Sequence, residues 1–132
     1  MNAHMDTLAY VAPVFLVHDL DRALAYYQDR MGFALDFNYE GMYASVVRDG
    51  CRVHLKSAAP SGRDQQAFED AEHIDACFAV SDASALASQF ADAGATFAVR
   101  LRASPYGKEF YIKDPDGHIL AFVQSGDAEA VS

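Results

Sequence analysis

The first half of the chain alternates between strand-like and helix-like spacing of its apolar residues. Residues 8–17 are mostly apolar and predict a strand, which Pro13 places at a sheet edge or a hinge. Asp19 or Asp21 can cap the helix that follows, and Gly32 ends it. The apolar stripe of this helix consists of Leu20, Ala23, Leu24, Tyr27 and Met31. Three strands are then predicted at 33–40, 42–48 and 51–57, with Gly41 and Asp49-Gly50 in the hairpin turns.

The second half repeats this order after a polar linker at residues 58–72. A strand is predicted at 74–80, and a helix follows from the cap residue Asp82 to Gly94. The stripe of this helix consists of Ala83, Leu86, Ala87 and Phe90. Strands at 96–101, 108–113 and 118–124 complete the pattern, and residues 126–132 are expected to form a loose tail.

An offset of 63 residues superimposes the two halves. The matched pairs are Phe15 with Phe78, Val17 with Val80, Asp19 with Asp82, and Tyr27 with Phe90; Asp49-Gly50 matches Asp116-Gly117 with a further shift. The fold class predicted from these matches is α+β, with two βαβββ modules at 8–57 and 73–125 in one domain covering 1–132. We expect a curved mixed sheet with helices outside and a concave face that is open to a ligand.

Residues 104–117 predict a loop, a strand and a tight turn. Pro115 presets φ at the second turn position, Asp114 opens the turn and Gly117 closes it, as in a type I turn. The strand at 118–124 then pairs back with the strand before the turn.

Composition narrows the possible partners. The 132 residues are 52% hydrophobic and carry a net charge of −9, which disfavours nucleic acid as a partner. The acidity fits either steering of a cationic small molecule or ordinary solubility. No apolar run approaches the ~18 residues that cross a bilayer, so no membrane partner is expected. Cys51 and Cys77 lack metal-type spacing and fit a reduced, cytoplasmic chain.

Strand alternation predicts which side chains line the concave face. Val53 and Leu55 should pack on the helix, so that Arg52, His54 and Lys56 face the concavity. The repeat relates His54 to Ala121 and Ala12 to Asp75. Four equivalent positions therefore face inward, namely Ala12, His54, Asp75 and Ala121.

Each polar candidate has two interpretations. His54 is a metal ligand or general base, or else a histidine of the pocket wall bonded to a neighbour. Asp75 is a metal ligand or an anchor for a cation, or else the partner of Arg52 or Lys56. The other histidines, His4, His18, His73 and His118, share no spacing and are expected to be scattered over the surface. Ser45, Ser57 and Ser104 have no His–Asp partner that would indicate a nucleophilic triad.

The aromatic candidates are Phe37, Tyr43 and Tyr106. Each could stack on a ligand, although aromatic residues more often belong to the core. Tyr106 lies between Pro105 and Gly107, where core burial is less expected.

Three motifs give the chain a family resemblance. The helix start Asp-Leu-Asp-Arg-Ala-Leu-Ala-Tyr-Tyr (19–27), the helix exit Met-Gly-Phe (31–33) and the hairpin Asp-Pro-Asp-Gly (114–117) resemble the vicinal oxygen chelate superfamily over about residues 8–125. Glyoxalase I, fosfomycin resistance proteins, extradiol dioxygenases and bleomycin resistance proteins belong to it. Metal-dependent members place His, Gln or Glu at the four inward positions. Because two of these are alanine here, the resemblance implies no metal or other cofactor, with His54 and Asp75 as the remaining ligand pair.

Within that superfamily the chain looks most like the bleomycin resistance proteins. The likeness rests on residues 13–15, which resemble a proline hinge after an exchanged N-terminal arm, and on 43–55 and 104–110. It implies a homodimer that binds and sequesters a bleomycin-like drug, such as a cationic glycopeptide, and so confers antibiotic resistance. The ligand-binding residues expected from it are Phe37, Tyr43, Arg52, His54, Asp75, Tyr106 and Phe110, with Phe37 and Tyr106 on either side of the drug's flat unit.

Two alternatives remain open at this point. One is a metal-dependent lyase, isomerase or oxygenase that uses His54 and Asp75 with water. The other is a binding or sensor module for a different metabolite, since a fold alone does not choose among such functions.

Overall fold

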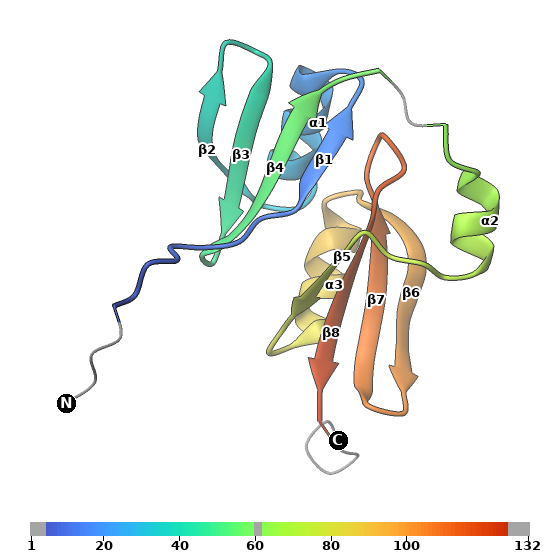
Figure 1. Ribbon diagram of the computed structural model, residues 1–132. Coiled ribbons are helices and arrows are strands. Elements are labelled where there is room, and N and C mark those ends of the chain that lie inside the picture. The colour runs from blue at the N-terminus through green and yellow to red at the C-terminus, as the bar shows by residue number, and fades with distance from the viewer. Residues whose placement is uncertain (1–4, 60–61, 127–132) are drawn as a thin grey trace.

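The computed structural model describes residues 5–59 and 62–126, which form two βαβββ modules (Figure 1). Module one consists of β1 (Val14–Val17), α1 (Leu20–Asp29), β2 (Ala34–Tyr39), β3 (Tyr43–Arg48) and β4 (Cys51–Ser57). A short helix, α2 (Gln65–Asp70), leads to module two. Module two consists of β5 (Ala76–Ala79), α3 (Ala83–Asp92), β6 (Thr96–Ser104), β7 (Gly107–Lys113) and β8 (Ile119–Ser125). The predicted α+β class with two modules is confirmed.

Each module has its own four-stranded mixed sheet. The strand orders are β1-β4-β3-β2 and β5-β8-β7-β6, and in each sheet the first strand is a parallel edge strand. Val14 lies opposite His54 in the first sheet, and Cys77 lies opposite Ala121 in the second. Strand pairing therefore follows the sequence repeat. The edge strands β1 and β5 are related by 63 residues, and their neighbours β4 and β8 by 67.

The two predicted helix starts are confirmed by their caps. Asp19 Oδ1 accepts a hydrogen bond from the Arg22 amide at 3.1 Å, and Asp82 Oδ1 accepts one from the Ala85 amide at 3.0 Å. Such caps satisfy amides that have no partner within the helix, and each typically stabilises by ~1 kcal/mol. Gly32 follows α1 at a φ of 70°, where a side chain would be strained.

The stripes of α1 and α3 pack on the sheets in one core that both modules share. All five stripe residues of α1 are buried, and so are Ala83, Ala87 and Phe90 of α3, whereas Leu86 is half-buried. Each sheet contributes to this core the side chains that face its helix, including Val53 and Leu55 as predicted. Burying a side chain of this size contributes about 1.5–3 kcal/mol.

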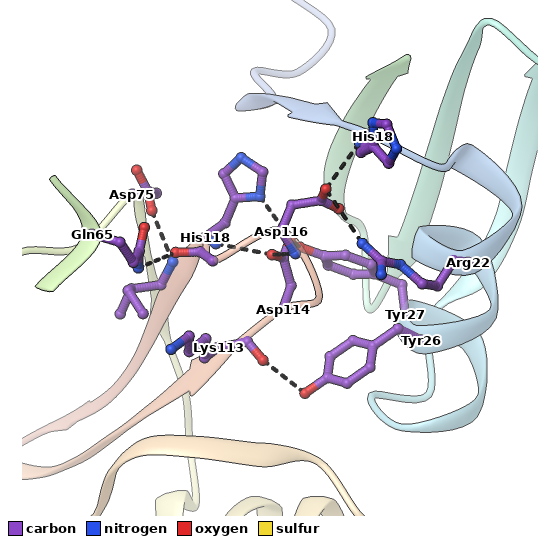
Figure 2. A network of polar contacts seen from close by, with 12 residues as sticks. His18, Arg22, Tyr26, Tyr27, Gln65, Asp75, Lys113, Asp114, Asp116 and His118 are labelled. Atoms are coloured by element: carbon purple, nitrogen blue, oxygen red, sulfur yellow. Dashed lines mark hydrogen bonds and ion pairs between the residues drawn. The ribbon is translucent and has the colours of Figure 1, made fainter. Parts of the chain in front are cut away.

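The β7–β8 turn joins module two to module one (Figure 2). The Tyr27 hydroxyl of α1 donates to Asp114 Oδ2 at 2.8 Å, and the His18 amide donates to Asp116 Oδ1 at 2.9 Å. The His118 ring stacks on Phe15 with the centroids 4.4 Å apart. The Gly117 amide donates to the Asp114 carbonyl and closes the predicted turn. His118, which we expected on the open surface, therefore belongs to the contact between the modules.

Two predicted elements need correction. The first strand begins at Val14 instead of Leu8, because the residues before Pro13 have no strand partner in the described chain. The linker at 58–72 contains α2, whose first turn is capped by Asp64. His4 and the predicted tail beyond Gly126 lie outside the described residues. Among the helices described, none has the length and apolar character needed to cross a membrane.

Helix α2 makes the two modules different. Its Phe68 packs on Tyr111, Ile119 and Ala121, which lie on the face of the second sheet opposite α3. We call the face of each sheet opposite its helix the concave face. The concave face of the second sheet is thus covered by its own chain, whereas none of the helices in the described residues covers that of the first.

Candidate functional site: an aromatic wall on module one

The candidate site begins with His54 on β4. Its neighbours Val53 and Leu55 are fully buried against the core, whereas the His54 side chain lies half-buried on the concave face. The predicted alternation along this strand is confirmed, since Arg52 and Lys56 also avoid the core.

Two tyrosine hydroxyls hold the His54 ring. Tyr43 Oη lies 2.7 Å from Nδ1, and Tyr10 Oη lies 3.3 Å from Nε2. A neutral imidazole has one donor and one acceptor nitrogen, and a hydroxyl can serve either. Both ring nitrogens are therefore engaged, as in the pocket-wall interpretation of His54.

Phe37 of β2 completes a cluster of rings around the histidine. Its ring lies nearly parallel to that of Tyr43, at 8° and 6.3 Å, and edge-on to His54, at 72° and 5.7 Å. The Phe37 side chain is 40% exposed, so it is not a core residue. We call the four residues Tyr10, Phe37, Tyr43 and His54 the aromatic wall.

Tyr10 is the member of the wall that the sequence analysis did not select. It lies two residues before Ala12, so the alternation that points Ala12 inward would also have pointed Tyr10 inward. The Arg52 guanidinium sits over the Tyr10 ring, 4.2 Å from its centroid, and its Nε lies 3.3 Å from Asp36 Oδ2. With Arg52 and Lys56 beside it, the wall presents ring faces and no carboxylate of its own.

Asp75 is held by a partner other than the expected Arg52 or Lys56. Both of its oxygens accept from Arg63, at 2.8 and 3.0 Å, and Oδ2 also accepts from the Ile119 amide. Burial alone would raise the pKa of Asp75, but these hydrogen bonds outweigh burial and hold the pKa below its usual value. The partner was missed because Arg63 lies in the segment predicted to be a polar linker.

The two remaining candidates occupy different environments. Phe110 is fully buried in the core and stacks on Phe122 with centroids 5.1 Å apart, so it cannot form part of the concave surface as expected. Tyr106 is 53% exposed at the β6–β7 turn, and its hydroxyl donates to Glu109 at 2.7 Å. Tyr106 lies in a turn of module two and Phe37 on a strand of module one, and their rings make no contact in the described chain.

The four inward positions do not fit a resident metal. Ala12 and Ala121 have no donor atom, and Ala121 is buried beneath α2. The His54 nitrogens and the Asp75 oxygens are already bonded to protein groups. Within residues 5–59 and 62–126, no group of three or more His, Cys, Asp or Glu side chains is placed to hold a metal ion. A catalytic metal usually needs at least three protein ligands, so we derive no metal-dependent step.

Comparisons with known proteins agree with this fold. The family model described as the Glyoxalase/Bleomycin resistance protein/Dioxygenase superfamily matches residues 7–122. A solved structure of the bleomycin-binding protein from bleomycin-producing Streptomyces verticillus, complexed with copper(II)-bleomycin, is 25% identical with a TM-score of 0.69, over 92% of this chain and 100% of that one. The bleomycin resistance determinant encoded on the transposon Tn5 is 20% identical with a TM-score of 0.67, over 89% and 98%.

A third similar structure is TnmS3, an antibiotic binding protein from Streptomyces sp. CB03234. It is 19% identical with a TM-score of 0.69, over 93% of this chain and all of that one. The search among curated proteins finds no match.

Proposed function

The chain belongs to the Glyoxalase/Bleomycin resistance protein/Dioxygenase superfamily, and from this we propose that it binds and sequesters a small molecule with a flat aromatic unit. The proposed ligand class is that of bleomycin-like antibiotics. Sequestration needs no bond to be broken, because tight binding alone lowers the concentration of free drug. We further propose that the protein acts in the cytoplasm, where its two exposed cysteines would stay reduced.

The aromatic wall is the observation that carries this proposal. Phe37 and Tyr43 present nearly parallel rings on an open face, and the tyrosine hydroxyls fix the ring of His54 between its neighbours. A preformed set of rings loses little side-chain entropy on binding. Each stacked aromatic pair is worth ~0.5–1.5 kcal/mol beyond the area that it buries.

The second wall of the proposed site would come from another copy of the chain. In a two-fold dimer, the concave face of one first sheet can meet the second sheet of the partner, and the exposed Tyr106 would lie at that boundary. This arrangement would place the ligand between Phe37 of one chain and Tyr106 of the other. A dimer built in this way would have two equivalent sites.

A thermal-shift screen tests the proposal. Copper-free bleomycin and copper(II)-bleomycin should each raise the melting midpoint, because a ligand that binds only the folded state stabilises it. Zn²⁺, Mn²⁺, Ni²⁺ or Fe²⁺ alone should not raise it. A shift with a metal alone, lost in His54→Ala, would contradict the proposal in favour of a metal-dependent enzyme.

A further inference from the structure

The sequence repeat predicts a second contact between the modules, equivalent to the one made by the β7–β8 turn. In that contact Arg22 also lies 3.6 Å from Asp116, beside the Tyr27–Asp114 hydrogen bond. The equivalent contact would place the β3–β4 turn of module one against β5 and α3 of module two. The structure leaves a cleft there instead.

Turn length is the first reason for the cleft. Five residues, 114–118, separate β7 from β8, whereas only Asp49 and Gly50 separate β3 from β4. Both of these residues have positive φ, at 51° and 79°, as in the tight type I′ turn of two-residue hairpins. The shorter turn has fewer residues with which to reach the opposite module.

Side-chain size is the second reason. The offset of 63 relates Arg22 to Ala85, and the offset of 67 relates His118 to Cys51. The arginine that pairs across the filled contact is thus replaced by a methyl group, and the stacked imidazole by a thiol. The cleft therefore lacks the ion pair and the ring stack that join the modules at the β7–β8 turn.

The resulting cleft has a volume of about 810 Å³, within the range of sites for drug-sized ligands. Phenylalanines from both modules line it together with two larger aliphatic side chains, namely Phe33, Phe78, Phe90 and Phe122 with Val80 and Leu86. Phe33, Phe90 and Phe122 belong to the shared core, which lies on the opposite side of the sheets from the aromatic wall. The cleft is therefore separate from the site proposed above.

The charged groups of the lining favour a cation. Arg48 is the positive one, and it already donates to the Met31 carbonyl and to Gln89 Oε1, both at 2.7 Å. Its guanidinium also lies 5.6 Å from the centre of the buried Phe90 ring, so a cation already packs against an aromatic ring at this edge of the cleft. Asp49, whose Oδ2 lies 3.7 Å from Arg48 Nε, and Asp82 are the other charged residues of the lining, and two carboxylates against one guanidinium leave it with a net negative charge.

We propose that this cleft between the modules is a second binding site, for a planar aromatic cation. The partly exposed Phe78 and Leu86 would pack on its flat body, and Asp49 and Asp82 would face its charge. The argument does not depend on the aromatic wall, so either proposal can fail without the other.

Methyl NMR with proflavine, a tricyclic aromatic cation, tests this proposal on the full-length protein. Val80 and Leu86 line the cleft and report binding there, whereas Val99 packs on the concave face of the second sheet. Proflavine should shift the Val80 and Leu86 methyl signals to saturation. Phe37→Ala should leave these shifts in place, because Phe37 belongs to the other site.

Two matched variants make the test specific. Ala85→Arg restores the residue found at position 22 and should close the cleft by reaching Asp49, which would weaken the binding at Val80 and Leu86 at least tenfold. Ala91→Arg adds the same side chain at an exposed position of α3 outside the lining and should change the affinity less than twofold. Absence of shifts at Val80 and Leu86, or equal effects of the two variants, would overturn the proposal.

Discussion

Asp114 shows what single residues contribute to this fold. It is a buried carboxylate that accepts four hydrogen bonds, from the Tyr27 hydroxyl, the Asp116 amide, and the amide and ring of His118. Burial, followed by the charge of Asp114, raises the pKa of Tyr27 well above its usual value, so this hydroxyl stays a donor. A buried charge is tolerated only with such partners.

Removing Asp114 should therefore cost more than removing one of its donors. We expect Tyr27→Phe to lower the free energy of unfolding by about 1–2 kcal/mol, and Asp114→Ala by about 3 kcal/mol or more, because three other donors lose their acceptor. Urea denaturation measures both. The control is Asp92→Ala on the exposed surface of α3, expected within about 0.5 kcal/mol of the parent. An Asp114→Ala loss no larger than that of the control would contradict the account.

At this scale, the sequence predicted much of the site but not its bonding. Strand alternation pointed His54 inward, and the family resemblance added Phe37 and Tyr43, which the structure brings together with it. The resemblance failed for Phe110, because β7 turns that ring toward the core. The partner of Asp75 is Arg63, 12 residues earlier in the segment that leads into α2, and no local pattern pairs the two.

Helix α2 is the element that separates the two concave faces. It buries little of itself, and its attachment is mainly polar: Arg63 holds Asp75, and Lys113 Nζ lies 2.8 Å from Glu69. The sequence predicted a linker here because a six-residue helix with one large apolar side chain, Phe68, has no periodic stripe. The position of α2 is therefore set by its contacts with module two and not by a pattern in its own sequence.

The polar attachment of α2 should be lost in acid. The pKa of Glu69 is lowered by its hydrogen bonds to Lys113 and Gln65, and that of Asp75 is also lowered. A lowered carboxyl pKa adds stability that is complete above the unfolded value, 4.5 for Glu69 and 3.8 for Asp75, and that disappears as the pH falls through the folded value. The stability of the docked helix should therefore fall below about pH 4.5.

Hydrogen exchange measures this undocking directly. At neutral pH, Arg63→Met should speed exchange of the α2 amides at least tenfold while β8 stays protected, because only the local contact is removed. Arg100→Met removes an exposed arginine elsewhere in module two and is the control. Equal protection of α2 in the two variants would mean that Arg63 does not hold the helix.

At the scale of the whole molecule, several large apolar side chains are exposed on module one. Leu8, Tyr10 and Val11 before β1 are exposed, as are Val14 and Leu16 on the strand itself. Large apolar patches on a soluble protein commonly mark an interface. The segment before Pro13 has no strand partner within the described chain, which leaves it available to a second copy.

We predict a two-fold dimer for this reason. Light scattering at micromolar concentration should give about twice the 14.4 kDa chain mass. Leu16→Asp should yield a folded monomer, because this side chain is exposed within one chain and would be buried in the dimer. Arg100→Asp, at an exposed position of the second sheet, should remain dimeric. A parent protein of monomer mass would refute the prediction.

At the scale of the molecule, the hydrophobic pattern and the repeat predicted both modules. The largest difference in element ends is at β1, which begins at Val14, directly after Pro13, instead of at residue 8. The cleft between the modules was not predicted, because it follows from the difference between a two-residue turn at Asp49 and a five-residue turn at Asp114. Turn length sets the distance between elements, which periodicity does not encode.

Titration calorimetry with copper-free bleomycin in the presence of EDTA tests the central claim most directly. We predict one ligand per chain and binding that needs no added metal. Phe37→Ala should weaken it about tenfold, or ~1.4 kcal/mol, through the loss of a stacking ring. Leu35→Ala, an equally exposed apolar position of β2, should bind like the parent. No heat of binding, or an affinity that is unchanged in Phe37→Ala, would contradict the account.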